Sequence, residues 1–150
     1  MLFDARPPRG SPDSEPWKYE PDRVAWRDPS TGLQCLILRS GLGSLCGYVR
    51  VPRDHPMHGM HRQRPVWRLL VHGGITFAGR IRWDRKTRGH WFGFDCAHAF
   101  DLVPGMLEPR RLLGMVAGAP EKYRTVQYVR YHCELLATQL ARKGRHETSP

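Results

Sequence analysis

The chain has 150 residues, a formal net charge of +10 and 40% hydrophobic residues, which fits one basic globular domain. It has no apolar run near the roughly 18 residues of a membrane-spanning helix. Its N-terminus lacks the basic start and apolar core of a secretory signal. We therefore expect a cytoplasmic protein with no membrane partner. The four cysteines form no Cys-x-x-Cys pair, which excludes a zinc ribbon or finger.

Arginine supplies 20 of the 24 basic residues. One interpretation is a polyanionic partner, because the guanidinium group matches phosphate geometry. The other is a GC-rich coding bias, which enriches arginine over lysine without selection for binding. Both interpretations stay open on the sequence.

The first 32 residues are rich in proline, aspartate, arginine and serine, and their large apolar residues are isolated. This composition predicts an extended, poorly ordered arm over 1–32, whose aromatic residues could pin its second half to the domain. A single domain is predicted over 33–143, followed by a disordered tail over 144–150.

Short apolar or alternating runs predict about five strands, over 33–38, 45–51, 66–71, 75–83 and 91–96. The first two form a hairpin. A two-residue turn at Ser40-Gly41 would place Cys35 opposite Cys46. The Gly73-Gly74 pair between the third and fourth runs suits a tight turn or the close approach of a ligand.

The clearest helix is predicted from Pro120 to Lys143, where apolar residues recur every three or four positions. Pro120 suits its first turn, and Gly144 is the expected stop. Strands followed by one helix predict the α+β class: an antiparallel sheet of about five strands packed by one long C-terminal helix.

The side chains that could catalyse a reaction or bind a ligand gather in two stretches, 71–76 and 91–101, each at the end of an apolar run. We expect these stretches to meet at a site. The candidate catalytic residues are His72, Asp95, Cys96 and His98. The candidate ligand-binding residues are Gly73, Gly74, Thr76 and Asp101, with His55 and His58 on a covering loop over 52–65.

Three chemistries fit this set. A divalent metal could be held by histidine, cysteine and carboxylate ligands. Cys96 could act as a nucleophile activated by a histidine. The Gly73-Gly74 amides could capture a phosphate or carboxylate, with His72 as acid or base. Strand alternation places Asp95 opposite Cys96, so the histidines His72 and His98 are the stronger pair and Cys96 is expected in the core.

A second cluster is strongly basic and lies between two tryptophans. Its residues are Arg80, Arg82, Arg85, Lys86 and Arg88. Basic residues interleaved with aromatic ones are typical of a surface for single-stranded nucleic acid. The alternative is a solvated hairpin tip.

Four motifs occur in a fixed order along the chain: Cys46-Gly47-Tyr48-Val49, Val51-Pro52 with His55-Pro56 and His58-Gly59, the stretch 71–79 with its His-Gly-Gly-Ile-Thr core, and Trp91-Phe92-Gly93-Phe94-Asp95-Cys96-Ala97-His98-Ala99. Together they resemble a group of small, functionally uncharacterised proteins of bacteriophages and bacteria, often actinobacteria. The resemblance spans roughly 33–142 and implies no activity. The pattern of that group has a glycine before the final aspartate, where this chain has Phe100.

These patterns support two functions. The first is a small domain whose pocket, lined by histidine, aspartate and cysteine, binds or hydrolyses a phosphorylated or nucleotide-like ligand. The second is a non-enzymatic, phage-type accessory protein that binds nucleic acid or a host protein through its basic surface.

Overall fold

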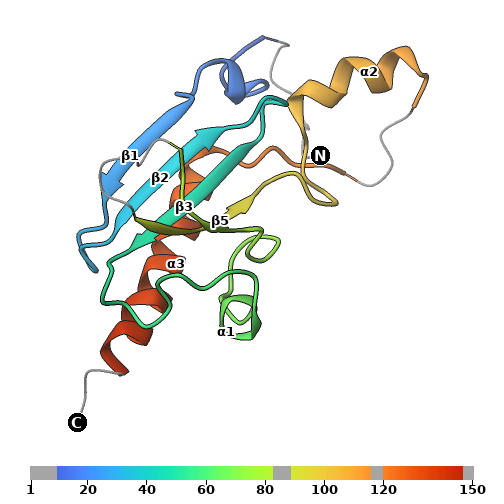
Figure 1. The fold of residues 1–150 in the computed structure, drawn as a ribbon. Coiled ribbons are helices and arrows are strands. Elements are labelled where there is room, and N and C mark those ends of the chain that lie inside the picture. Colours follow the sequence, from blue (N-terminus) through green and yellow to red (C-terminus); the bar gives the residue numbers. More distant parts are fainter. Residues whose placement is uncertain (1–9, 83–88, 116–119, 147–150) are drawn as a thin grey trace, which may run out of the picture.

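The computed structural model describes residues 10–82, 89–115 and 120–146. In chain order its elements are η1 (Pro16–Lys18), β1 (Arg23–Arg27), β2 (Gln34–Arg39), β3 (Leu45–Val51), α1 (Arg64–Trp67), β4 (Phe77–Gly79), β5 (His90–Asp95), η2 (Pro104–Met106), α2 (Leu107–Leu112) and α3 (Val126–His146). The strands form one antiparallel sheet in the order β1-β2-β3-β5-β4 (Figure 1). The predicted α+β class is confirmed. None of the helices in the described ranges has the length and apolar character needed to cross a bilayer.

The core lies between the sheet and α3, which packs on β2 and β3 (Figure 1). Residues of α3 at spacings of three and four are fully buried: Val129, Cys133, Leu136 and Leu140. They meet the apolar face of the sheet, including Val49 and Phe92. Full burial of each such side chain stabilises the fold by roughly 1.5–3 kcal/mol, so this single contact layer fixes the position of α3 on the sheet.

Two glycines in the central strands make room for aromatic rings. A Cβ on Gly47 would overlap the ring of Phe94, and a Cβ on Gly93 would overlap the ring of Tyr48. In each case the ring belongs to the residue paired with that glycine in the β3–β5 register. These glycines therefore allow tight packing on both faces of the sheet without a bulge.

The β2–β3 hairpin is confirmed, and the alternative with a two-residue turn at Ser40-Gly41 is excluded. Arg39 pairs with Leu45, so the connection has five residues, 40–44. Cys46 therefore lies opposite Leu38, not Cys35, and both cysteines are free.

The sheet begins inside the segment predicted to be an arm. In β1, Val24 and Trp26 alternate with exposed residues and pack against the core. Just before this strand, Glu20 accepts hydrogen bonds from Tyr123 Oη, at 2.9 Å, and from the backbone N–H of Val126, at 2.7 Å. The second half of the arm is thus tied to the start of α3. Residues 1–9 lie outside the described residues.

The strand predicted over 66–71 is wrong, because α1 and a following turn occupy this segment. Val66 and Leu69 are buried while Trp67 and Leu70 are exposed, which is a helical spacing. Pro65 stands in the first turn of α1, where its missing N–H costs nothing. The next predicted strand, 75–83, is shorter in the structure, where β4 covers Phe77–Gly79.

The bounds of the long helix differ from the prediction at both ends. The helix starts at Val126 rather than Pro120, because Lys122 pairs instead with the backbone at Asp101. It continues through Gly144 to His146, so the tail predicted to be disordered begins in helix. A Cβ on Gly144 would lie 3.2 Å from Cδ2 of His55, so this glycine leaves room for a ring that packs against the helix.

Candidate functional site

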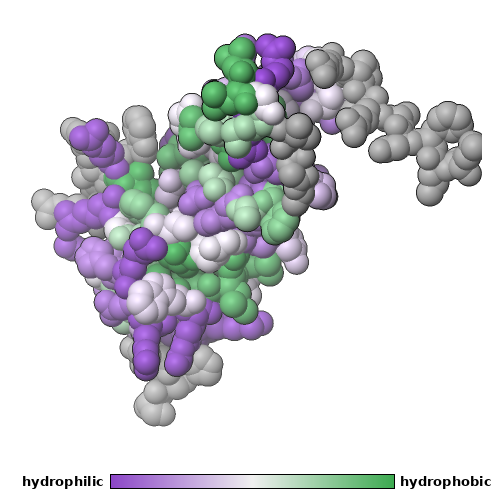
Figure 2. All heavy atoms as spheres, turned by 90° about the vertical axis from the view of Figure 1, so that its right-hand side faces the viewer, coloured by the Kyte–Doolittle hydropathy of each residue, from purple (hydrophilic) through white to green (hydrophobic). Residues whose placement is uncertain are grey.

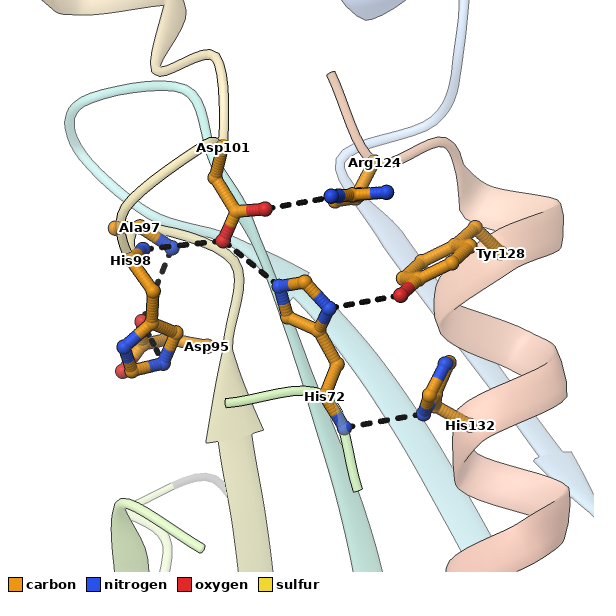
Figure 3. Close-up of polar contacts among 8 residues, drawn as sticks. All are labelled: His72, Asp95, Ala97, His98, Asp101, Arg124, Tyr128 and His132. Atoms are coloured by element: carbon orange, nitrogen blue, oxygen red, sulfur yellow. Dashed lines mark hydrogen bonds and ion pairs between the residues drawn. The ribbon is translucent and has the colours of Figure 1, made fainter. Parts of the chain in front are cut away.

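The two motif stretches meet beside the first turns of α3, as expected. His72 lies in the turn after α1, and Asp101 lies beyond the end of β5. Nε2 of His72 donates a hydrogen bond of 2.7 Å to Oδ2 of Asp101. This contact joins the segment before β4 to the segment after β5 (Figure 3).

Asp101 is the centre of a buried polar network. Its side chain has no exposed surface. Besides His72, it accepts hydrogen bonds from Nε of Arg124, at 2.8 Å, and from the backbone N–H of His98, at 3.0 Å. Burial would raise the pKa of this carboxyl, but the three hydrogen bonds outweigh it and hold the pKa below its usual value. Asp101 is therefore an anion that positions its neighbours.

The other ring nitrogen of His72 is also engaged. Nδ1 lies 2.8 Å from Oη of Tyr128. Burial raises the pKa of that phenol, so the hydroxyl stays protonated and donates a hydrogen bond to Nδ1. The backbone N–H of His72 donates to Nδ1 of His132, at 3.1 Å. Figure 3 shows the His72 ring held between Asp101 and α3. With both nitrogens occupied, His72 orients other groups and is not free to act as a base.

Three members of this network were missed in the sequence. Tyr128 and His132 are four residues apart and lie on one face at the start of α3, and Arg124 precedes that helix by two residues. This polar and aromatic row borders the apolar stripe of the same helix. The spacing is the signal that could have revealed them.

Asp95 and His98 form a second, more open pair. Oδ1 of Asp95 lies 3.2 Å from Nε2 of His98, and their side chains are 32% and 34% exposed. The same oxygen accepts a hydrogen bond of 3.1 Å from the backbone N–H of Ala97, which closes a tight turn. The ring of His98 packs directly on Gly73, where any Cβ would overlap it. Gly73 thus positions His98, in addition to adopting a positive φ of 68°.

A cleft of about 670 Å³ opens between this turn and the β2–β3 connection. Its lining residues are Ser40, Gly41, Leu42, Ser44, Cys46, Asp95, Ala97 and His98. Two polar atoms of these lining residues, Oγ of Ser44 and Nε2 of His98, are buried and have no hydrogen-bond partner among the described residues. The contact between His98 and Asp95 is an ion-pair distance without hydrogen-bond geometry. Buried polar atoms are nearly always paired, so these two atoms have unused hydrogen-bonding capacity.

Cys96 does not belong to the cleft. It is 2% exposed within the main core, as its strand position predicts. Burial, with a smaller contribution from Asp101, raises the pKa of its thiol far above the ordinary range. A thiol that stays protonated is a poor nucleophile. Cys46, which lines the cleft, also has its pKa raised by burial and by Asp95.

The remaining candidate residues lie apart from the cleft. His55 is buried, with Nε2 donating to the Leu140 carbonyl at 2.7 Å, and so ties its loop to α3. His58 lies beside His90, at 5.4 Å between ring centroids. Thr76 donates its backbone N–H to the Gly93 carbonyl.

The amide pair at 73–74 is not fully available to an anion. The backbone N–H of Gly74 donates to the Val71 carbonyl at 3.0 Å and closes the turn. Within the described ranges, no three histidine, cysteine or acidic side chains are grouped to hold a metal ion. Of the basic cluster, Arg80 and Arg82 are exposed. Arg85, Lys86 and Arg88 lie outside the described residues.

Comparison of the chain with protein-family models, with curated proteins and with solved structures gives no match. The resemblance in the four ordered motifs stays a prediction.

Proposed function

We propose that this protein binds a small phosphorylated or nucleotide-like ligand in the cleft beside Asp95 and His98. The observation that carries the proposal is that two residues lining the same cleft, Ser44 and His98, each have a buried polar atom without a hydrogen-bond partner, Oγ and Nε2 respectively. Both atoms can donate a hydrogen bond to a ligand oxygen. A group rich in acceptors, such as a phosphoryl group, would satisfy both of them.

The surroundings of His98 favour a fixed orientation. Its backbone is held by Asp101, its ring packs on Gly73, and Asp95 lies at the ring edge. Pre-organised donors bind more tightly than flexible ones, because less side-chain entropy is lost. The net charge of +10 adds a general attraction for anions.

His98 and Asp95 also supply acid–base groups for hydrolysis of the ligand. In this proposal a water oxygen attacks phosphorus while the P–O bond to the leaving group breaks. The ring nitrogen of His98 that does not donate to the ligand takes the proton of this water and returns it to the leaving oxygen, and Asp95 supports the transient charge on the ring. Such proton transfers typically contribute ~10²–10⁴-fold to a rate. Cys96 has no role in this chemistry, because it is buried and protonated, and His72 acts as a positioning residue.

Thermal unfolding with adenosine monophosphate or inorganic phosphate tests the binding, with sodium chloride at equal ionic strength as the reference. A ligand at about 100 times its Kd stabilises by roughly 2.7 kcal/mol, which raises Tm by roughly 5–10 °C in a chain of this size. We expect this shift in the wild type. His98→Ala and Ser44→Ala should abolish most of it.

Two features make this experiment selective. The contact of His98 with Asp101 uses the backbone, so His98→Ala should fold normally. Ser30→Ala, at an exposed serine away from this cleft, is the matched control and should keep the full shift. A wild type without any shift, or equal shifts in all three variants, would contradict the proposal. Phosphate release from nucleotides, lost in His98→Ala and Asp95→Asn, tests hydrolysis separately.

A further inference from the structure

The outer face of α1 combines exposed basic and aromatic side chains. Val66 and Leu69 point into the core, which leaves Arg64, Trp67 and Arg68 outward at spacings of three and four. The two arginines are exposed, and Trp67 is 62% exposed, although tryptophan is usually well buried. An exposed tryptophan between two arginines indicates a contact surface rather than a packing site.

The charge around this face has a single sign. Residues 55–82 contain five arginines and no aspartate or glutamate. These arginines are Arg62, Arg64, Arg68, Arg80 and Arg82, and all five are exposed. Within the described ranges none of them forms an ion pair with a carboxylate. Their charges are therefore available to an external anion.

The basic face continues from α1 to the edge of the sheet. A ring nitrogen of His61, just before α1, lies 3.3 Å from the Ala78 carbonyl in the outermost strand, β4. Arg80 follows this strand. Burial is the main cause of the lowered pKa of His90, which lies beside His61, and the positive charge of Arg80 adds to it. Figure 2 shows hydrophilic side chains gathered around hydrophobic ones over the lower part of the molecule, at the level of α1.

We propose that this surface, formed by α1 and the exposed arginines beside β4, binds single-stranded nucleic acid. The five exposed arginines complement a phosphate backbone, and Trp67 offers a flat ring on which a base stacks. Stacking on an aromatic side chain and backbone contacts to arginine together are typical of sequence-independent single-strand binding. A duplex, whose bases are already stacked, would use the arginines but not Trp67.

Fluorescence anisotropy of the full chain with a labelled oligothymidylate of about 16 nucleotides tests this surface. Arg64→Ala/Arg68→Ala should weaken binding and lower the slope of log K against log salt by about 1.4, since each phosphate contact to a single strand contributes about 0.7. Trp67→Ala should weaken binding roughly 5- to 150-fold and leave the slope unchanged. Trp67→Phe should retain most of the affinity.

Arg23→Ala/Arg111→Ala is the matched control, because it also removes two exposed arginines but lies on β1 and α2. It should change the affinity less than Arg64→Ala/Arg68→Ala does. Equal losses in the two double variants would show that net charge alone attracts the oligonucleotide and would overturn the proposal. Absence of binding, or tighter binding of a duplex with no effect of Trp67→Ala, would also overturn it. His98→Ala should bind normally, which separates this surface from the ligand cleft.

Discussion

Oδ2 of Asp101 and Nε2 of His72 lie 2.7 Å apart, although 29 residues separate them in the chain. The contact connects the turn that contains Gly73 to the turn that contains His98. Because the His98 ring packs on Gly73 and its backbone binds Asp101, the pair fixes one wall of the cleft. His72 and Asp101 thus form a buried support, and Asp95 and His98 form the more open pair at the cleft.

Replacing Asp101 with asparagine should be strongly destabilising. The change leaves Arg124 and His72 next to a neutral, buried partner, and breaking a buried ion pair on one side typically costs about 3–5 kcal/mol. Chemical denaturation of Asp101→Asn measures the loss. Glu108→Gln serves as the control, since its ion pair with Arg111 is exposed and should contribute less than about 1 kcal/mol. Similar losses in the two variants would contradict the central role of Asp101.

Mild acid should destabilise the protein through His90. Burial lowers the pKa of this histidine below that of the unfolded chain, so the unfolded state binds the proton first. The stability is complete above about pH 6.5 and falls as the pH drops from there toward the folded pKa. His90→Gln keeps a donor for the Met60 carbonyl and has no titrating ring. Its free energy of unfolding should decline less between neutral pH and about pH 5 than that of the wild type.

Asp101 should add a second loss of stability at lower pH. Its lowered pKa means that its contribution is present above the unfolded value, near pH 4, and disappears as the pH falls through the folded pKa. The acid limb of the stability profile should therefore be shallower in Asp101→Asn. An unchanged acid limb would show that other carboxylates determine acid unfolding.

The two glycines of the turn after His72 should differ in their tolerance of alanine. Gly74 has a φ of 81° with open space around its Cβ position, so Gly74→Ala should cost only the backbone strain, about 1–2 kcal/mol. Gly73→Ala adds a collision with the His98 ring and should cost more. It should also weaken ligand binding at the cleft. Equal costs in denaturation would mean that His98 moves aside freely.

The thiols should react slowly in the native state. Burial raises the pKa of Cys35 to about 12, and it also raises the pKa values of Cys96 and Cys133 well above their usual range. Cys46 is partly exposed at the cleft and should be the first to react with a thiol reagent near pH 8, although its pKa is also raised. Peptide mapping after timed labelling measures the order. Early labelling of Cys96 would contradict its assignment to the core.

The strands predicted over 33–38, 45–51 and 91–96 correspond to β2, β3 and β5. Burial alternates along β3, whereas β5 is buried at all but its last position. β1 was missed because only Val24 and Trp26 mark its inner face, between arginines, at the edge of the sheet. The run 66–71 was misassigned because its apolar residues are contiguous, and contiguity does not distinguish a strand from a short buried helix.

The sequence predicts where the site lies, but it does not predict which of its residues are buried supports and which are open to the cleft. The end of β5 and the turn at 72–74 meet as expected. No sequence pattern shows that Asp101 is buried while Asp95, six positions earlier, is open, because that depends on how α3 packs. Phe100 contributes to this arrangement: it adopts a φ of 71°, a left-handed backbone conformation that favours glycine.

The glycine and aromatic pairs of the central strands have an evolutionary consequence. Gly47 accommodates Phe94, and Gly93 accommodates Tyr48, so neither member of a pair can change size alone. Among homologous chains, gain of a side chain at either glycine should accompany loss of the ring opposite. The two pairs should therefore covary independently, one on each face of the sheet, and would fix the β3–β5 register from sequences alone.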